Sequence, residues 1–206
     1  MLWNIALKTF NGIWPMLTIF LVVLISVRIA HILSHRERFC FYKEFLTLVF
    51  LIYILLLFQL LTSTEINQSS GINYVPFTEI LRYEFGSQLF LYNVLGNILV
   101  FVPFGYFISY YIKAKKITPI FVVTLIASTC VELVQLKIGR SFDVDDILLN
   151  VLGGLFGYLL YVGLTAIKNH LPKFLQRDSF YNVLCIIFVG AIVLYYLGYI
   201  KLGFLL

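Results

Sequence analysis

The chain contains six runs of apolar residues, each long enough to cross a lipid bilayer as a helix. They cover residues 13–33, 45–61, 89–112, 117–136, 147–167 and 180–199. A helix needs about 20 mainly apolar residues to span the hydrocarbon core, whereas a barrel strand needs only about 10 alternating ones. The sequence therefore predicts an all-α fold, a polytopic transmembrane helix bundle with six spans.

The composition supports a membrane protein and limits its chemistry. Hydrophobic residues make up 61% of the chain and charged residues only 12%, far from the soluble globular range. No motif for nucleotide binding, metalloprotease activity or haem attachment occurs, so no cofactor is predicted. No basic surface studded with aromatic residues indicates nucleic acid, and the expected partners are membrane lipids. The oligomeric state does not follow from the sequence.

The basic residues predict the orientation of the spans. One side of the predicted topology has ten of them: Arg28, Arg36, Arg38, Lys43, Lys113, Lys115, Lys116, Lys168, Lys173 and Arg177. The other side has five: Lys8, Arg82, Lys137, Arg140 and Lys201. Because cytoplasmic loops carry the excess of Lys and Arg, both termini are predicted to be extracytoplasmic.

This topology brings polar residues of the third, fourth and fifth spans to the same outer depth. The candidate ligand-binding residues are Asn93, Asn97, Glu132, Gln135, Arg140, Asp143, Asp146 and Asn150. Within each span they recur at three- or four-residue intervals, so each set is expected to share one helix face. Polar groups are costly inside a membrane and usually mark a working site. One outward-facing polar cluster is therefore predicted.

Glu132 is expected to need a partner, and Arg140 is the nearest candidate in the chain. Arg140 could fasten helices through this pair, or its guanidinium could bind an incoming carboxylate or phosphate in the same planar geometry. Gln135 is interpreted as a packing residue. Asp145 and Lys137 are interpreted as a solvated rim.

Asp143, Asp145 and Asp146 precede the fifth span, where the helix dipole favours negative side chains. Three carboxylates beside Glu132 could also coordinate Mg²⁺ or Ca²⁺. The segment lacks the glycine and the distal glutamate of a calcium loop, so no metal site is assigned.

Small residues and a proline predict how the spans pack. Gly153, Gly154 and Gly157 are expected to bring the fifth span against the third or fourth. Pro103 is expected to bend the third span and to leave a carbonyl for a neighbour to satisfy. The outer loop, residues 65–88, includes a possible short helix after Pro76, which either lies on the outer leaflet or covers the polar cluster; the interfacial position is favoured.

The ordered set of these motifs resembles the VanZ-like family of bacterial membrane proteins. It consists of Asn97, Phe101, Pro103, Gly105, Glu132, Gln135, Arg140, Asp143, Asp146, Asn150, Gly153, Gly154 and Gly157, preceded by Tyr74–Phe77. The match covers residues 72–161. We expect a VanZ-like core over 72–165, a two-span N-terminal region with an outer loop over 1–71, and a basic loop with the last span over 166–206.

The resemblance implies a multi-pass protein of the bacterial cell membrane, of a family associated with resistance to teicoplanin-type glycopeptides. A binding module for an amphipathic lipid, a lipid-linked cell-wall precursor or a lipoglycopeptide is favoured, because no histidine or nucleophile joins the cluster. The alternative is a membrane hydrolase or transferase with Glu132 as general acid or base and Asp143 and Asp146 as metal ligands. A transporter or flippase would expose Glu132 to both membrane faces.

Overall fold

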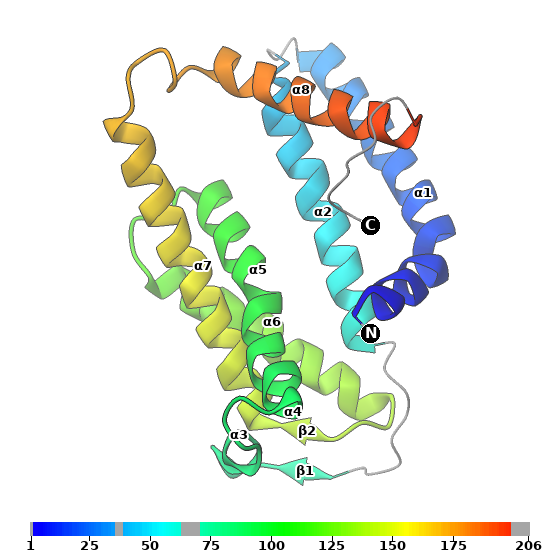
Figure 1. The fold of residues 1–206 in the computed structure, drawn as a ribbon, viewed down its shortest axis with the longest axis vertical. Coiled ribbons are helices and arrows are strands. Elements are labelled where there is room, and N and C mark those ends of the chain that lie inside the picture. Colours follow the sequence, from blue (N-terminus) through cyan, green and yellow to red (C-terminus); the bar gives the residue numbers. More distant parts are fainter. Residues whose placement is uncertain (1, 36–38, 63–70, 199–206) are drawn as a thin grey trace. The chain divides into compact units, whose positions relative to one another are not determined.

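A computed structural model describes residues 2–35, 39–62 and 71–198 of the chain (Figure 1). Its elements are α1 (Leu2–His35), α2 (Phe41–Thr62), β1 (Ile72–Asn73), α3 (Thr78–Arg82), α4 (Gln88–Phe90), the π-helical turn η1 (Leu91–Leu95), α5 (Gly96–Ile112), α6 (Thr118–Lys137), β2 (Phe142–Asp143), α7 (Val144–His170) and α8 (Asp178–Tyr196). Six helical stretches of the described residues are long and apolar enough to cross a membrane. The predicted all-α fold with six spans is confirmed, although the predicted end of the last span, residue 199, lies outside the described residues.

The chain divides into two compact units. Unit 1 takes in Met1–Trp14 and Tyr53–Thr165, and unit 2 takes in Pro15–Ile52 and Ala166–Leu206. Helices α1, α2 and α7 each contribute to both units. The predicted polar cluster belongs wholly to unit 1.

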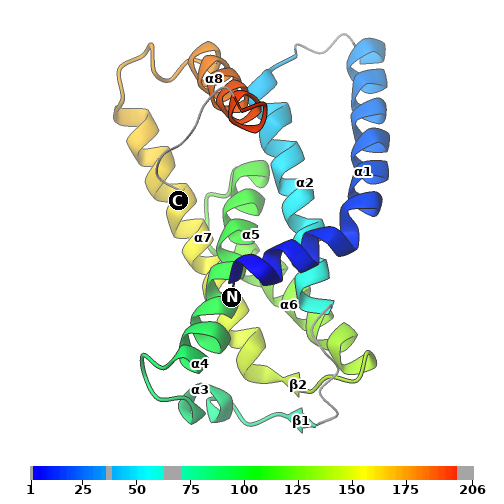
Figure 2. The same cartoon turned by 45° about the vertical axis from the view of Figure 1, so that its right-hand side comes forward.

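Close backbone packing joins α5, α6 and α7 in unit 1 (Figures 1 and 2). A Cβ atom at Gly153 would meet the carbonyl oxygen of Ile98, and one at Gly157 would meet that of Val102, both in α5. A Cβ atom at Gly154 would instead meet the side chain of Thr124 in α6. The predicted role of these glycines is therefore confirmed: they let α7 lie against both α5 and α6.

The α5 helix continues through Pro103, and a neighbouring helix satisfies a carbonyl beside it. The Tyr53 hydroxyl of α2 donates to the Val100 carbonyl over 2.6 Å. Pro103 lacks the N–H that would pair with the Leu99 carbonyl four residues earlier, and the Tyr53 bond falls on the next carbonyl of the same turn. Leu57 of α2 packs with Phe101 and Phe104 of α5, and these three residues form the buried apolar core of unit 1.

Short extended segments close one end of unit 1. Strands β1 and β2 pair in parallel, with Ile72 opposite Phe142 and Asn73 opposite Asp143. Figures 1 and 2 show the strand pair together with α3 and α4 at this end of α5, α6 and α7. The pairing therefore fixes the chain ahead of α3 next to the start of α7, where the predicted cluster lies.

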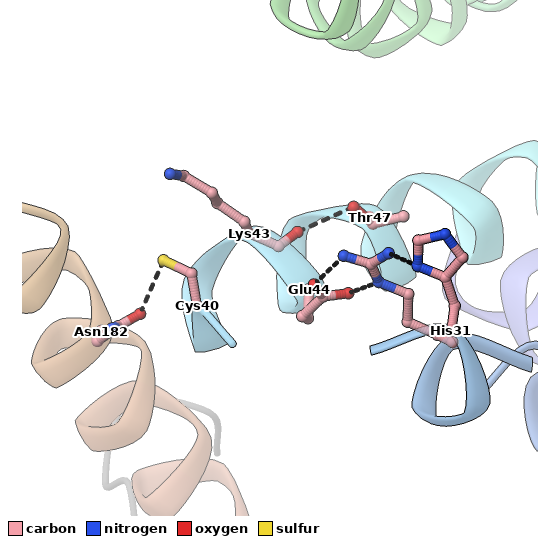
Figure 3. Close-up of polar contacts among 7 residues, drawn as sticks. His31, Cys40, Lys43, Glu44, Thr47 and Asn182 are labelled. Atoms are coloured by element: carbon pink, nitrogen blue, oxygen red, sulfur yellow. Dashed lines mark hydrogen bonds and ion pairs between the residues drawn. The ribbon is translucent and has the colours of Figure 1, made fainter. Parts of the chain in front are cut away.

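Unit 2 is held by polar contacts among α1, α2 and α8 (Figure 3). The Arg28 guanidinium donates to both carboxylate oxygens of Glu44, over 2.9 and 2.8 Å. Asn182 Oδ1 accepts from the backbone N–H of Tyr42 over 2.9 Å, at the start of α2, and the thiol of Cys40 lies 3.7 Å from the same oxygen. Asn182 thus supplies an acceptor to an N–H of the first turn of α2, which has no partner within the helix.

Candidate functional site

One face of α6 carries a row of buried polar side chains. Thr124, Ser128 and Glu132 follow one another at four-residue intervals, and Glu132 is only 1% exposed. Residues four apart on a helix lie above one another, so the row forms a single face. Burial in the protein keeps these groups away from lipid, where an unsatisfied polar group costs several kcal/mol.

Glu132 binds the start of α7 rather than standing alone. Its Oε2 accepts the backbone N–H of Asp143 over 3.1 Å. Asp143 in turn caps α7, because its Oδ1 accepts the N–H of Asp145 over 2.8 Å, the N-cap arrangement for a helix that begins at Val144. The sequence predicted Arg140 as the partner of Glu132. The structure shows a further partner that the sequence did not predict, the backbone N–H of Asp143.

The prediction that Asp145 belongs to a solvated rim is wrong. Its side chain is fully buried, and its two carboxylate oxygens accept the backbone N–H groups of Phe77 and Ile80. These N–H groups begin α3 and would otherwise lack acceptors. Asp145 therefore anchors the loop helix to α7, whereas Lys137 is exposed, as expected for a rim residue.

Asp146 joins α7 to α5. Its Oδ1 accepts the side-chain amide of Asn97. The turn that contains Asn93 is π-helical; Asn93 is exposed and lines the pocket with Asp146, and Asn97 is half-buried and bonds to Asp146. Both asparagines therefore lie near the Asp146 carboxylate at the start of α7.

Gln135 and Arg140 hold the end of α2. Gln135 Nε2 and Arg140 Nη1 both donate to the Leu61 carbonyl, over 3.0 and 2.9 Å. The last carbonyls of a helix have no partner within it, and a cation near this end is favourable. The predicted packing role of Gln135 thus has a specific form, a hydrogen bond to α2.

Asn150 lies about one helical turn further along α7 than Asp146. Its Nδ2 donates to Ser128 Oγ over 3.0 Å, and its side chain is buried. Within the ranges that the structure describes, its Oδ1 has no hydrogen-bond partner. Asn150 therefore joins α7 to the buried polar face of α6.

A pocket of about 500 Å³ opens at this end of unit 1. It is lined by Gly71, Ile72, Asn73, Ile80, Arg82, Tyr83, Asn93, Val94, Arg140, Ser141, Asp143, Asp145, Asp146 and Leu149. Four of the eight predicted residues line it: Asn93, Arg140, Asp143 and Asp146. Of the other four, Glu132 and Asn97 bond directly to lining residues, Gln135 shares an acceptor with Arg140, and Asn150 lies apart from the pocket, bonded to Ser128.

Sequence reasoning missed the contribution of the outer loop. Asn73, Arg82 and Tyr83 line the pocket, and Asn73 Nδ2 lies 3.3 and 3.4 Å from the two carboxylate oxygens of Asp143. The sequence had left open that this loop covers the cluster, beside the favoured position on the outer leaflet, and the pocket lining shows which of its residues lie next to the cluster.

The pocket carries both signs of charge. Arg82 and Arg140 bring guanidinium groups, and Asp143, Asp145 and Asp146 bring carboxylates. In the part of the chain that the structure describes, no three His, Cys, Asp or Glu side chains are grouped as metal ligands would be. The aspartates serve instead as acceptors for helix ends and for amides.

These features define a multi-pass helical membrane protein with a charged pocket at one end of its spans. The comparisons with known proteins agree with this class. The chain belongs to the VanZ-like family: the family model VanZ/LLP1 matches residues 45–168. Protein VanZ of Enterococcus faecium is 30% identical over 150 residues, which cover 72% of this chain and 81% of that protein. The match begins in α2, ahead of the motifs noted in the sequence, and no solved structure matches.

Proposed function

We propose that this chain is a protein of the bacterial cell membrane whose pocket faces outward and binds the polar head of an amphipathic molecule. The candidate ligands are a membrane lipid, a lipid-linked cell-wall precursor and a lipoglycopeptide. Such binding would contribute to resistance against teicoplanin-type antibiotics. The observation that supports this proposal is a pocket of about 500 Å³ with both signs of charge at the end of membrane-crossing helices.

The charge bias of the loops supports the outward position. The end of unit 1 with the pocket includes Arg82, Lys137 and Arg140, which belong to the side with fewer basic residues. Under the positive-inside rule that side is extracytoplasmic, which also puts both termini outside. A ligand with an acyl chain would meet the pocket at the outer leaflet.

The lining residues suit a head group with both charges. A guanidinium such as that of Arg82 binds phosphate or carboxylate through two parallel hydrogen bonds, and the Asp146 carboxylate accepts hydrogen bonds from ammonium groups. The side-chain amide of Asn93, which is exposed, adds both a donor and an acceptor. The pocket is therefore suited to recognise a zwitterionic head.

Burial of Glu132 favours binding over the hydrolase or transferase alternative. A general acid or base must come within hydrogen-bond reach of the substrate. Glu132 is 1% exposed, is not a lining residue of the pocket, and uses Oε2 to accept the Asp143 N–H. No observation in the described residues favours a catalytic role over this structural one.

The test measures binding of fluorescent teicoplanin to the purified protein in phospholipid nanodiscs, together with teicoplanin susceptibility of a sensitive host that expresses it. The Arg82→Gln variant removes a lining cation, and Lys137→Gln removes an exposed cation from outside the pocket. We expect Arg82→Gln to weaken binding and protection, and Lys137→Gln to change neither. Equal binding by both variants and the wild-type protein, or no binding by any, would contradict the lipoglycopeptide as ligand.

A glycopeptide without an acyl chain serves as the ligand control. If the acyl chain positions the antibiotic at the leaflet, the control should compete poorly. Vesicles with and without a lipid-linked cell-wall precursor then separate direct antibiotic binding from precursor binding, because only the latter changes when the precursor is omitted.

A further inference from the structure

The loop segment 72–85 exposes large apolar side chains. Leu81 is 81% exposed and Phe85 is 91% exposed, and the same segment exposes Ile72, Tyr74, Val75 and Phe77. Contiguous exposed apolar surface of this kind usually marks a contact with a protein partner or a membrane. Its position in the chain, directly before a membrane-crossing helix, limits which of these applies.

The segment has two different sides. Ile72, Asn73, Ile80, Arg82 and Tyr83 line the pocket, whereas Tyr74, Leu81 and Phe85 are exposed and are not among its lining residues. The segment is thus amphipathic although α3 is only five residues long. The side that lines the pocket carries the polar groups of Asn73, Arg82 and Tyr83, and the other side is apolar.

Specific contacts fix the backbone of this segment. Asp145 accepts the N–H groups of Phe77 and Ile80, and Asn73 Oδ1 accepts the N–H of Val75 over 3.1 Å. Phe77 itself has φ of 69°, a left-handed conformation that is uncommon for a bulky residue and persists only where its surroundings impose it. The exposed apolar side chains are therefore presented on a fixed support rather than at random.

The apolar side is continuous with the surface of a membrane-crossing helix. The ring of Phe85 lies 5.1 Å from the ring of Phe90, which belongs to the span Gln88–Ile112. Exposed leucines continue along that span at Leu89 and Leu99. Since the exposed face of a span contacts lipid, the aromatic contact extends the lipid-facing surface onto the loop segment.

We propose that the apolar side of segment 72–85 inserts into the membrane leaflet at the pocket end of unit 1. The lipid bilayer is the occupant of this surface. Insertion places the pocket, which the other side of the segment lines, at the depth of the lipid head groups. The proposal concerns the position of the segment and holds whether or not the pocket binds the ligands considered above.

The test measures the depth of labels on single cysteines. In a background with Cys40→Ser, Cys130→Ser and Cys185→Ser, the variants Leu81→Cys and Phe85→Cys carry an environment-sensitive fluorophore in phospholipid vesicles. Ser141→Cys is the matched control, because Ser141 is exposed at the same end but lines the pocket. Spin-labelled lipids with the nitroxide on the acyl chain report contact with the hydrocarbon of the leaflet, and iodide reports contact with water.

We expect spin-labelled lipid to quench the labels at positions 81 and 85 more than the label at 141, and iodide to quench them less. Equal quenching at the three positions, or stronger lipid quenching at position 141 than at 81 and 85, would overturn the proposal. A label at Phe77→Cys, also exposed on this segment, provides a third test position. Its quenching by lipid and by iodide should resemble that at positions 81 and 85. None of these measurements requires a pocket ligand, so failure here leaves the proposed binding function open to its own test.

Discussion

The backbone N–H of Asp143 donates to Oε2 of Glu132 over 3.1 Å, and both residues are buried. This bond joins the turn before α7 to the buried polar face of α6. It places Asp143 where its own side chain caps α7 and contacts Asn73 of the outer loop. A carboxylate in the interior thus positions a carboxylate that lines the pocket.

Replacing Glu132 should therefore lower the stability of the fold rather than remove a catalytic group. The Glu132→Gln variant keeps a side-chain oxygen that can accept the Asp143 N–H, whereas Glu132→Leu removes the acceptor. Leaving a buried donor unsatisfied costs about 1–3 kcal/mol. We expect Glu132→Leu to unfold at a clearly lower temperature in detergent micelles, with Glu132→Gln close to wild type in stability and ligand binding. A Glu132→Gln protein that folds but loses all function would instead support a catalytic or proton-transfer role.

Replacing Asp145 should release the outer loop. The Asp145→Ala variant removes the acceptor of two backbone N–H groups, at Phe77 and Ile80, each net worth about 1.5–3 kcal/mol when the partner is charged. Hydrogen–deuterium exchange should rise over residues 77–82 and stay unchanged in α5. Glu84→Ala is the control, since Glu84 is exposed on the same loop. Unchanged exchange in Asp145→Ala would show that other contacts hold the loop.

The helical architecture could be predicted because the membrane imposes it. Runs of about 20 apolar residues have few alternatives in a bilayer, and glycines at four-residue spacing have few uses besides close helix packing. Both inferences depend on local sequence alone. The predicted contact of these glycines with the third or fourth span followed from the same reasoning and is confirmed, with Gly153 and Gly157 against α5 and Gly154 against α6.

The polar contacts depend on tertiary structure and were harder to predict. Asp145 looked like a surface residue because nothing in its neighbourhood of the chain indicates the N–H groups of Phe77 and Ile80, more than sixty residues earlier. The π-helical turn η1, which contains Asn93, was also not predicted, because a regular α-helix was assumed there. The role of these residues in ligand binding stays a prediction.

The shared acceptor of Gln135 and Arg140 predicts a non-additive pair. A carbonyl oxygen can accept two hydrogen bonds, so Gln135→Leu should cost only about 1 kcal/mol while Arg140 still donates to Leu61. The double variant with Arg140→Leu leaves this helix-end carbonyl without either donor. We expect its loss in free energy of unfolding to exceed the sum of the single losses by about 0.5 kcal/mol or more. Strict additivity in a double-mutant cycle would show that the two donors act independently.

The glycines of α7 offer a matched pair of substitutions. A Cβ atom at Gly157 would meet the backbone of Val102 and Tyr106 in α5, whereas one at Gly163, six residues further along the same helix, meets nothing within 4 Å. Overpacking costs typically about 1–3 kcal/mol and more where backbone must move, while Gly to Ala at an open helical position gains about 0.4–1 kcal/mol. We expect Gly157→Ala to lower the unfolding temperature and the folded yield, and Gly163→Ala to keep or raise both. Equal stability of the two variants would mean that α7 and α5 lie further apart in the membrane than the backbone contacts at Gly157 require.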